Sequence, residues 1–494
     1  MLSIRSHFRS AIAVCLTLTL GACASMGNIH PESSRIDPDT LGAGGAIQRA
    51  AGNVEWPRQQ WWETLHDNQL NQLLRVALAD NPGLRGAQAR VKQARAIAGI
   101  AEQNTEIKGQ ADASLNRELY SAHGTTPAPL AGNYAWRNQA TLSASYDLDL
   151  WGKNRDALAA ALDDVQLASA ESQIARLTLE TAIVRSYIQL SLQFELQDII
   201  RATLTQREQL LDITRRRRQA GLATEFDTTS VEATLPIVKR DLERTVEAIQ
   251  LLRNQLAALS GKGPADGERI ARPTLALHQA PALPAALPAE LIGRRPDIVA
   301  QRWRVEAASK RIKVAKADFY PNINLLAFVG LQSFGFPKFL DTNSQIRGIA
   351  PAISLPIFSG DRLRGQLGNQ TAQYDAAVEQ YNATVVQALN DVADTVVKAQ
   401  SLQQQDALTV QSLQLARRAR LLAEQAFRAG MTDSINAIGA QVALLNEEQQ
   451  TAQIDARKLD SYATLMAALG GGVGEAGATA AANQAPAAKV AVLP

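Results

Sequence analysis

The chain contains the same long module twice, and this duplication constrains its fold more than any other feature. Each copy has the pattern of a helix, two alternating strands, a very long helix, a Gly turn and a second long helix, over residues 81–261 and 295–470. A duplication of this size usually means two pseudo-equivalent parts around an axis. We therefore expect one integrated architecture rather than several independent domains. Matching segments recur in the same order: residues 81–84 with 295–298, 150–152 with 357–360, and 220–222 with 429–431.

The first 22 residues have the pattern of a lipoprotein signal peptide. Arg5 and Arg9 precede an apolar run over residues 11–20, which is too short to span a bilayer but suits a signal-peptide core. Small residues then precede Cys23, as the peptidase that cleaves lipoproteins before a lipid-modified Cys requires. The sequence therefore predicts lipidation, such as palmitate, at Cys23. A secretory peptide cleaved elsewhere is the alternative.

Composition limits the function of the mature chain. Removal of residues 1–22 leaves one Cys, so an intramolecular disulfide is excluded. It also leaves 48 of the 50 basic residues against 48 acidic ones, and a neutral chain is a poor candidate for nucleic-acid binding. Ala24 and Ser25 follow Cys23 without an Asp, and the resemblance to bacterial lipoproteins then implies transfer to the outer membrane.

Four segments alternate apolar and polar residues over about ten positions, the length that a tilted strand needs to cross a bilayer. They cover residues 107–115, 140–150, 323–331 and 349–357. In the second segment, Tyr146 and Leu148 are expected to face lipid, and Asp147 and Asp149 a water-filled lumen. A half-buried sheet of a soluble protein has the same period and is the alternative. No other apolar stretch approaches the length of a membrane-spanning helix, so any span must be built from strands.

The connections within the two strand pairs, over residues 121–137 and 333–345, are predicted to be outward-facing hairpin loops. They hold aromatic residues near the strand ends, where interfacial girdles occur: Tyr134, Trp136, Phe334 and Phe336. An open sheet of four strands has unsatisfied edges and cannot sit in lipid. Several chains must therefore close one barrel, and geometry alone permits a dimer, a trimer or a larger ring.

Two runs predict helices of exceptional length. Residues 153–218 contain neither Pro nor Gly and extend roughly 100 Å at about 1.5 Å per residue. Residues 361–428 are similar. In the second copy, apolar residues recur at steps of three and four from Val378 to Leu402 and from Ile435 to Met466, the period that winds helices in pairs. A soluble coiled-coil rod would explain these helices but not the strands.

Several motifs along the chain resemble those of a known family. Over residues 61–470 the chain resembles the outer membrane factors, which are TolC-like export ducts, and among them the NodT/OprM-type lipoproteins. The resemblance implies a mixed α and β membrane protein. It implies a homotrimer in which four transmembrane strands per chain form a twelve-stranded shared barrel that continues into a long periplasmic α-helical barrel. The match rests on Trp61-Trp62, Leu65, Asp67, Leu70, Asn81-Pro82, Arg294-Arg295-Pro296-Asp297-Ile298, Ala307-Ala308 and Phe319-Tyr320-Pro321.

The resemblance also implies the function. The chain would be the outer membrane channel of a tripartite export system, a passive duct for efflux of drugs and toxic compounds. A resistance-nodulation-division (RND) pump in the inner membrane would drive it through a periplasmic adaptor, or membrane fusion protein. A type I protein-secretion duct and a structural trimeric coiled-coil envelope lipoprotein are the alternatives. The sequence leaves the exported substrate and the pump family open.

Two turns gain a role from the resemblance. In family members the corresponding turns are periplasmic tips that meet the adaptor, which assigns Gly221, Leu222, Gly430 and Met431 to that contact. Gly permits the positive φ of a tight turn, and Leu or Met offers an apolar side chain. The alternative is that both turns are only helix C-caps. The run Arg215–Arg218 before the first tip is interpreted as a solvated helix end, where cations favour the dipole.

The aperture at the tips departs from the family pattern. Family members carry two acids on the helix after the second Gly turn, and these positions are Asn436 and Gly439 here. Asp227 matches the acid of the first copy, and Asp433 is the nearest acid in the second. We therefore expect that an acidic ring does not gate this channel in the usual way.

No catalytic site, cofactor or metal is expected. The five His residues are scattered and none belongs to an HExxH motif, and the Gly-Lys pair at residues 261–262 lacks the preceding Gly of a phosphate loop. Enzymatic activity and nucleic-acid binding are therefore not predicted.

Six successive segments are expected: a signal peptide (1–22), a lipidated N-terminal periplasmic segment (23–80), the first repeat (81–270), a Pro/Ala-rich linker (271–294), the second repeat (295–470) and a flexible Ala/Gly-rich tail (471–494).

Overall fold

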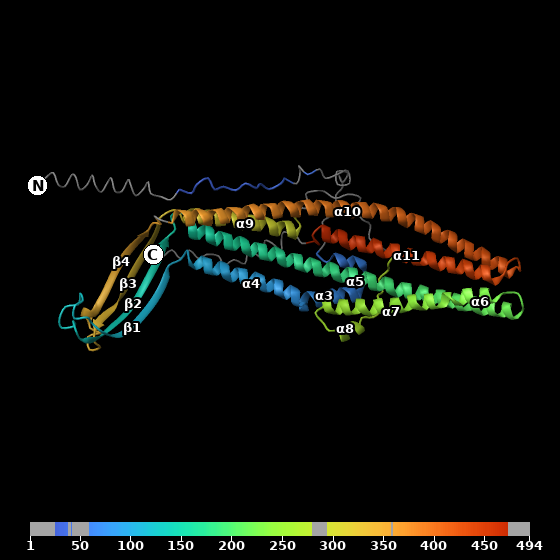
Figure 1. The fold of residues 1–494 in the computed structure, drawn as a ribbon, viewed down its shortest axis with the longest axis horizontal. Helices are drawn as coiled ribbons and strands as arrows, with labels where there is room; N and C mark the ends of the chain where they lie inside the picture. The colour runs from blue at the N-terminus through green and yellow to red at the C-terminus, as the bar shows by residue number, and fades with distance from the viewer. Residues whose placement is uncertain (1–24, 38–40, 42–58, 279–293, 357–358, 473–494) are drawn as a thin grey trace. The chain divides into compact units, whose positions relative to one another are not determined.

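The computed structural model describes residues 25–37, 41, 59–278, 294–356 and 359–472 (Figure 1). The predicted signal peptide and Cys23 lie outside the described residues. The chain divides into two compact units, and each unit takes segments from both copies of the repeat. The first comprises Met1–Arg35, Arg90–Ala168 and Gln301–Tyr381, and the second comprises Ile36–Ala89, Ser169–Ala300 and Asn382–Pro494.

The first copy of the repeat folds in the predicted order with one correction. Its elements are α4 (Pro82–Gln103), β1 (Lys108–Leu119), β2 (Tyr134–Leu148), α5 (Lys153–Gln219), α6 (Glu225–Glu232) and α7 (Thr234–Leu259). The prediction of one continuous helix after the Gly turn was wrong, because α6 and α7 are separate. Pro236 explains the break, since it lacks an amide hydrogen and its ring crowds the carbonyl of Glu232, where α6 ends.

The second copy repeats this order with unbroken helices. Its elements are α9 (Pro296–Ala317), β3 (Asn322–Phe334), β4 (Gln345–Ser354), α10 (Gly360–Arg428) and α11 (Ser434–Ala468). Shorter elements accompany the repeats: η2 (Trp61–Leu65), α3 (Asn68–Asp80), α8 (Pro264–Glu268) and η4 (Thr342–Ser344).

The two longest helices, α5 with 67 residues and α10 with 69, confirm the predicted lengths. The start of α5 is capped by Asp149, whose carboxylate accepts from the amides of Asn154 and Arg155 at 3.1 and 2.9 Å. No Pro or Gly interrupts the helix before Gly221, so nothing ends it earlier. Among the described helices, none is both long enough and apolar enough to cross a membrane.

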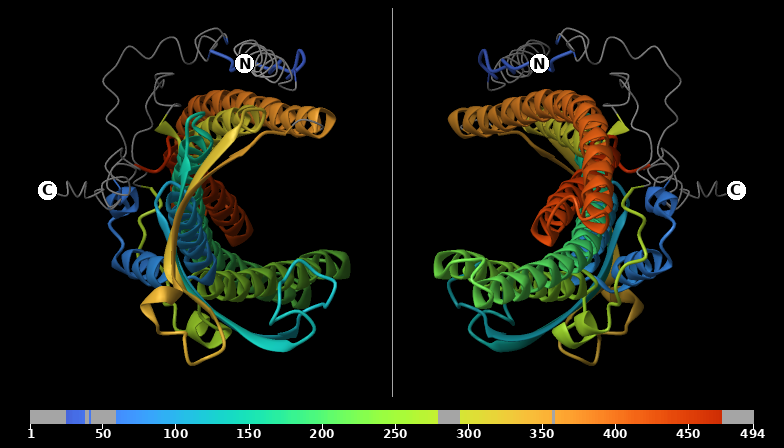
Figure 2. Two further views of the ribbon diagram at one scale, coloured as in Figure 1. Left: turned by 90° about the vertical axis from the view of Figure 1, so that its left-hand side faces the viewer. Right: turned by 90° about the vertical axis from the view of Figure 1, so that its right-hand side faces the viewer.

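The four strands form one antiparallel sheet in the order β1-β2-β3-β4, and Figure 2 shows them side by side in a curved surface. The register runs without interruption: Leu142 on β2 lies opposite Ala111 on β1 and Val329 on β3. Because side chains alternate along a strand, this register brings all four predicted apolar sets to a single face of the sheet.

The strands extend further toward the hairpins than the alternation predicted. Pairing between Arg117 and Trp136 continues the first ladder, although the polar residues there break the hydrophobic alternation. Backbone hydrogen bonding therefore defines these ends, and the predicted hairpin loops are shorter than expected. The strand ends nearest the hairpins are Leu119, Tyr134, Phe334 and Gln345. At the other end, β2 stops at Leu148 and β4 at Ser354, so the predictions that they continue to residues 150 and 357 were wrong, and Asp149 caps α5 instead of lying in a strand.

In the first unit, an apolar core lies between α9 and α10. It includes Phe319 and Leu367, which are almost fully buried, with Ile312, Ala315 and Leu363. The N-terminal segment from residue 25 packs on this core through Met26 and Ile29. The amides of Glu32 and Ser33 both donate to Asp375 on α10 at 3.0 Å, so the segment is held by its backbone as well.

Candidate functional site

One face of the sheet, here called the apolar face, is exposed and almost without charge. Leu142 is 60% exposed and Ile349 75%, and Tyr146 and Leu148 lie on the same face. Exposed apolar surface of this extent marks an interaction with another protein or with a membrane. The pattern is that of strands in lipid, with apolar side chains outward and polar ones inward.

The opposite face, here called the polar face, carries hydrogen-bonded side chains. Asn324 on β3 donates to Asp147 on β2 at 2.7 Å, and these residues are direct cross-strand partners. Arg137 lies 3.6 Å from Glu118 in an ion pair between β2 and β1. On β1 and β2 this face has the character expected of a wall that contacts water, whereas β3 adds Leu326 and Phe328 to the same face.

The two Gly turns have the same geometry. Gly221 and Gly430 both have φ +71°, a region that favours Gly because a side chain there is strained. The Leu222 amide donates to the Arg217 carbonyl at 2.7 Å, and the Met431 amide donates to the Ala426 carbonyl at 2.9 Å. The Gly221 and Gly430 amides also donate, to the carbonyls of Arg218 and Phe427 three residues earlier, and each pair of bonds forms a Schellman C-cap. Both turns are thus helix caps, and both also present a largely exposed side chain, Leu222 at 69% and Met431 at 76%.

Sequence reasoning missed Phe226, which lies in α6 five residues after Gly221 and is 78% exposed. An aromatic side chain at this exposure adds to the apolar surface of the first tip. The signal was present in the sequence, because Phe226 stands among polar neighbours at the start of a helix.

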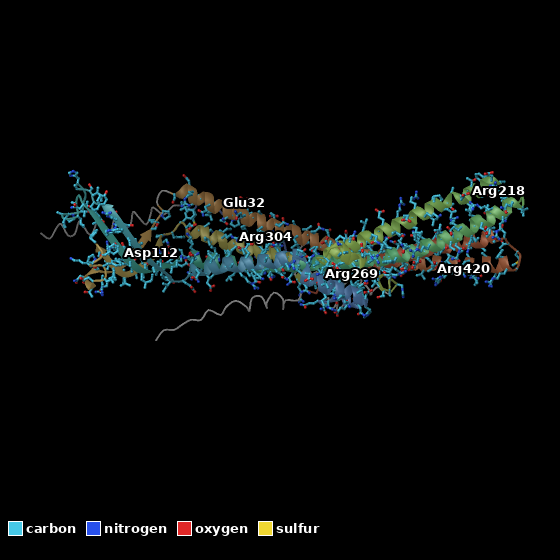
Figure 3. All side chains as sticks on the ribbon, turned by 90° about the horizontal axis from the view of Figure 1, so that it is seen from below. Glu32, Asp112, Arg218, Arg269, Arg304 and Arg420 are labelled. Atoms are coloured by element: carbon cyan, nitrogen blue, oxygen red, sulfur yellow. The ribbon has the colours of Figure 1, made fainter. Side chains whose placement is uncertain are left out.

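The four arginines before the first tip each have an acidic partner. Arg218, labelled in Figure 3, lies 3.7 Å from Glu225, and Arg217 lies 2.9 Å from Asp433 at the start of α11. Arg215 and Arg216 pair with Glu232 and Asp212 in the same way. Paired and exposed, they match the interpretation of a solvated helix end.

Both candidate aperture acids are engaged in helix caps. Asp227 accepts from the amide and the hydroxyl of Thr224 at 2.8 and 2.7 Å, and these bonds hold its pKa below the ordinary value. Asp433 caps α11 by accepting from the Asn436 amide at 3.2 Å while it pairs with Arg217. Asn436 donates to the Thr432 hydroxyl at 2.8 Å. Each carboxylate therefore has local donors of its own.

The motif residues Asp67 and Arg295 have structural partners. Asp67 is 1% exposed and caps α3, and it accepts from the Tyr187 hydroxyl at 2.9 Å and from the amide and hydroxyl of Thr274. Arg295 donates to Asp297, to Asp391 on α10 and to the carbonyl of Ala468, the last residue of α11. Each motif residue thus joins segments that are distant in the sequence.

Within the described ranges, no three or more His, Cys, Asp or Glu side chains come together in a way that could hold a metal ion. The described histidines are His30, His66, His123 and His278, and His7 lies outside these ranges.

Comparison with known families decides the identity. The family model described as "Outer membrane efflux protein" matches residues 73–262 and 287–471, which together make up most of the chain. The chain belongs to this family. The two matched segments coincide closely with the two copies of the repeat.

Individual relatives and solved structures support the same family. The fusaric acid resistance protein FusA of Burkholderia cepacia is 43% identical over 368 residues, which are 73% of this chain and 69% of FusA. The multidrug resistance outer membrane protein MdtP of Escherichia coli K12 is 29% identical, over 92% of this chain and 94% of MdtP. Among solved structures, the outer membrane protein VceC of Vibrio cholerae has a TM-score of 0.77 and 35% identity, over 84% of this chain and 99% of VceC.

These matches confirm the resemblance to TolC-like channels, the mixed α and β channel fold and the function. The chain is an outer membrane efflux channel protein. Its relatives are channel proteins, a class distinct from enzymes.

Proposed function

We propose that three copies of this chain close a continuous duct across the outer membrane and the adjoining periplasm. The observation that carries the proposal is the sheet, which has one apolar face, one polar face and two open edges at β1 and β4. A sheet with open edges is unstable in lipid, whereas β4 of one copy can pair with β1 of the next. Three copies supply twelve strands, enough for a barrel with a water-filled lumen.

A seam between helices of neighbouring copies supports the same trimer. In the second unit, α10 exposes Leu408, Leu415 and Leu422, which are spaced by seven residues. At the other end of the same arc of helices, α7 exposes Ile237 and Leu251, fourteen residues apart (Figure 2). Such spacing is typical of a helix that packs along another helix. We infer that α10 of one copy packs against α7 of its neighbour.

The seam is testable by a single charge. Leu415→Asp is expected to reduce the trimer fraction of the detergent-solubilised protein in gel filtration with light scattering. Gln414→Asp, at an exposed neighbouring position outside the stripe, is the matched control and should leave the trimer intact. Equal trimer fractions for both variants would remove α10 from the interface.

We propose further that the tips bind a periplasmic adaptor, which links the duct to an inner-membrane pump of the RND type. Leu222, Phe226 and Met431 offer the exposed apolar surface, and Gly221 and Gly430 fix the two turns that present Leu222 and Met431. Burial of these side chains in an interface is favourable by about 25 cal/mol for each Å² of apolar area.

The exported molecules are proposed to be small toxic compounds. This follows from the relatives, whose names describe fusaric acid resistance and multidrug resistance. We infer that the duct acts passively and that the pump selects the cargo. Expression in a strain that lacks its own outer membrane channel should restore drug resistance. Leu222→Asp combined with Met431→Asp should abolish that resistance while the trimer persists. Full resistance with both substitutions would contradict the adaptor contact.

We propose that the mature chain is also anchored by lipid on Cys23. The segment that follows supports this, because Met26 and Ile29 pack on the core of the first unit and Arg364 on α10 donates to the Ser25 carbonyl at 3.0 Å. The chain just after the anchor is thus fastened to the unit that holds the sheet.

The aperture is proposed to lack a free acidic ring. Asp227 and Asp433 are satisfied by caps, and Asn436 and Gly439 stand at the family's acidic positions. Multivalent cations added from the periplasmic side should therefore block the channel poorly. Asn436→Asp with Gly439→Asp should create a block that weakens as salt rises, since close carboxylates in a narrow pore attract cations. A side chain fits at Gly439, because no atom lies within 4 Å of an added Cβ. Strong block of the unmodified channel would instead identify Asp227 or Asp433 as the lining acid.

A further inference from the structure

Two arginines interrupt the otherwise uncharged apolar face of the sheet. Register and alternation place Arg117 of β1 and Arg347 of β4 on this face, and the other described strand residues there carry no charge. The polar face differs, because it carries five charged residues of both signs, including Asp112 (Figure 3). The five are Lys108, Asp112, Glu118, Arg137 and Asp147.

Both arginines lie near the hairpin end of an edge strand. Arg117 is two residues from the end of β1, and Arg347 is two residues from the start of β4, which is about 7 Å along a strand. The Arg117 guanidinium lies 5.3 Å from the centroid of the Tyr134 ring. Trp136 and Phe336 pack together nearby, with ring centroids 5.4 Å apart. Basic and aromatic side chains thus share this end of the sheet.

A shallow apolar groove of about 610 Å³ adjoins Arg347. The small side chains of Ala144 and Ala327 alternate there with larger apolar neighbours, and this leaves room at the surface. Its lining on the apolar face includes Leu142, Ala144, Ala327, Val329, Arg347 and Ile349. A hydrocarbon chain beside a guanidinium group fits this combination of lining residues.

A lone arginine on a lipid-facing strand is costly near the membrane midplane, by about 2–4 kcal/mol, and costs about 0–1 kcal/mol near the interface. Each arginine lies two residues from the hairpin end of its own strand, although Val329 lies opposite both Arg347 and the mid-strand Leu142. An anionic partner would offset the cost of a charge at that depth. Guanidinium groups bind phosphate in a bidentate geometry, and the planar group also packs on aromatic rings.

We propose that Arg347 and its groove bind a phosphorylated, acylated glycolipid of the outer leaflet, with the phosphate on the guanidinium and an acyl chain in the groove. The assignment rests on the proposed trimeric duct, in which the hairpins point outward because the helices leave the opposite ends of the strands. In that trimer β1 of the neighbouring copy lies beside β4, and a pairing that brings their hairpin ends level would set Arg117 of the neighbour beside Arg347 as a second guanidinium. Two guanidinium groups suit a headgroup with more than one phosphate.

The test uses the purified full-length protein in mixed micelles titrated with purified lipid A, followed by native mass spectrometry. The unmodified protein is expected to retain lipid A, and Arg347→Gln is expected to weaken binding roughly tenfold. Arg347→Lys keeps the charge without the bidentate geometry and should fall between the two. Arg137→Gln removes an arginine from the polar face and is the matched control, which should bind as the unmodified protein does.

A second titration separates the lipid sources. Phosphatidylglycerol has one phosphate and no sugar, and it should bind more weakly than lipid A. Equal affinity for both lipids, or equal lipid A binding by Arg347→Gln and the unmodified protein, would overturn the proposal. Gel filtration of each variant reports the trimer independently. Loss of lipid A binding by a variant that remains trimeric supports the site, whereas an unmodified protein that forms no trimer contradicts the proposed duct itself.

Discussion

Replacement of Glu180 by Gln is expected to stabilise the protein in alkaline solution and to remove part of its pH dependence. Glu180 lies on α5 and its residue surface is 3% exposed. Arg176, one helical turn earlier, donates to its carboxylate at 2.7 Å. Burial outweighs this partner and raises the pKa of Glu180 from 4.5 to about 7.

The direction of this pH dependence follows from the linkage between proton binding and folding. A carboxyl whose pKa is higher in the folded state stabilises the fold at low pH, where it is protonated in both states. This stability is lost as the pH rises from about 4.5 to about 7, because the unfolded chain ionises first. At about 1.4 kcal/mol per pH unit, the loss is about 3 kcal/mol. Gln keeps the shape and a hydrogen-bonding oxygen but cannot ionise, so it avoids the loss.

The assay is the thermal unfolding midpoint of the detergent-solubilised protein at pH values from 5 to 8.5. Glu180→Gln should unfold at a higher temperature than the unmodified protein at pH 8, and the difference should shrink toward pH 5. Glu208→Gln removes an exposed carboxyl from the same helix and is the control. A variant whose midpoint follows the same pH curve as the unmodified protein would refute the reasoning.

Three further predictions concern the sheet, the anchor and the core. Leu142 lies mid-strand on the apolar face, whereas Leu148 ends β2, so Leu142→Lys should cost about 2–4 kcal/mol and Ser143→Lys on the polar face little; equal unfolding midpoints would assign the sheet to water. Cys23→Ala should abolish lipid labelling yet leave some trimer in the outer membrane fraction, and complete loss of membrane association would contradict a membrane-spanning sheet. Asp67→Ala should lower stability by about 2–5 kcal/mol in denaturant titrations, since it removes the acceptor of the buried Tyr187 hydroxyl and of the Thr274 amide and hydroxyl, and an unchanged midpoint would show that the network contributes nothing.

Much of the fold could be predicted because the chain obeys two simple periods. Alternation located all four strands, and the observed register brings Tyr146 and Leu148 to the predicted apolar face. The absence of Pro and Gly located the long helices. The break before α7 was missed even though Pro236 was visible, because a Pro near a helix start is also compatible with a continued turn.

The candidate site was less predictable, since its character depends on which partners meet in space. The sequence showed Asp227 and Asp433 near the tips, but not their partners. Asp227 accepts hydrogen bonds from Thr224 in a helix cap, and Asp433 both caps α11 and pairs with Arg217. The sequence also did not predict that the apolar face carries two charged residues. Arg117 and Arg347 fell outside the predicted strands, and only the register assigns them to a face.

The most direct test of the duct is conductance combined with thiol labelling. With the proposed cleavage and lipidation at Cys23, the mature chain would have no free Cys, so an introduced thiol would be unique. Ser143→Cys places it on the polar face and Leu142→Cys on the apolar face, one residue apart. The purified protein should conduct in discrete steps in planar bilayers. A bulky charged thiol reagent added in water should reduce the steps of Ser143→Cys and leave those of Leu142→Cys unchanged. Channels whose conductance is insensitive to modification at Ser143→Cys, or a folded trimer that conducts no current, would contradict a lumen lined by the polar face.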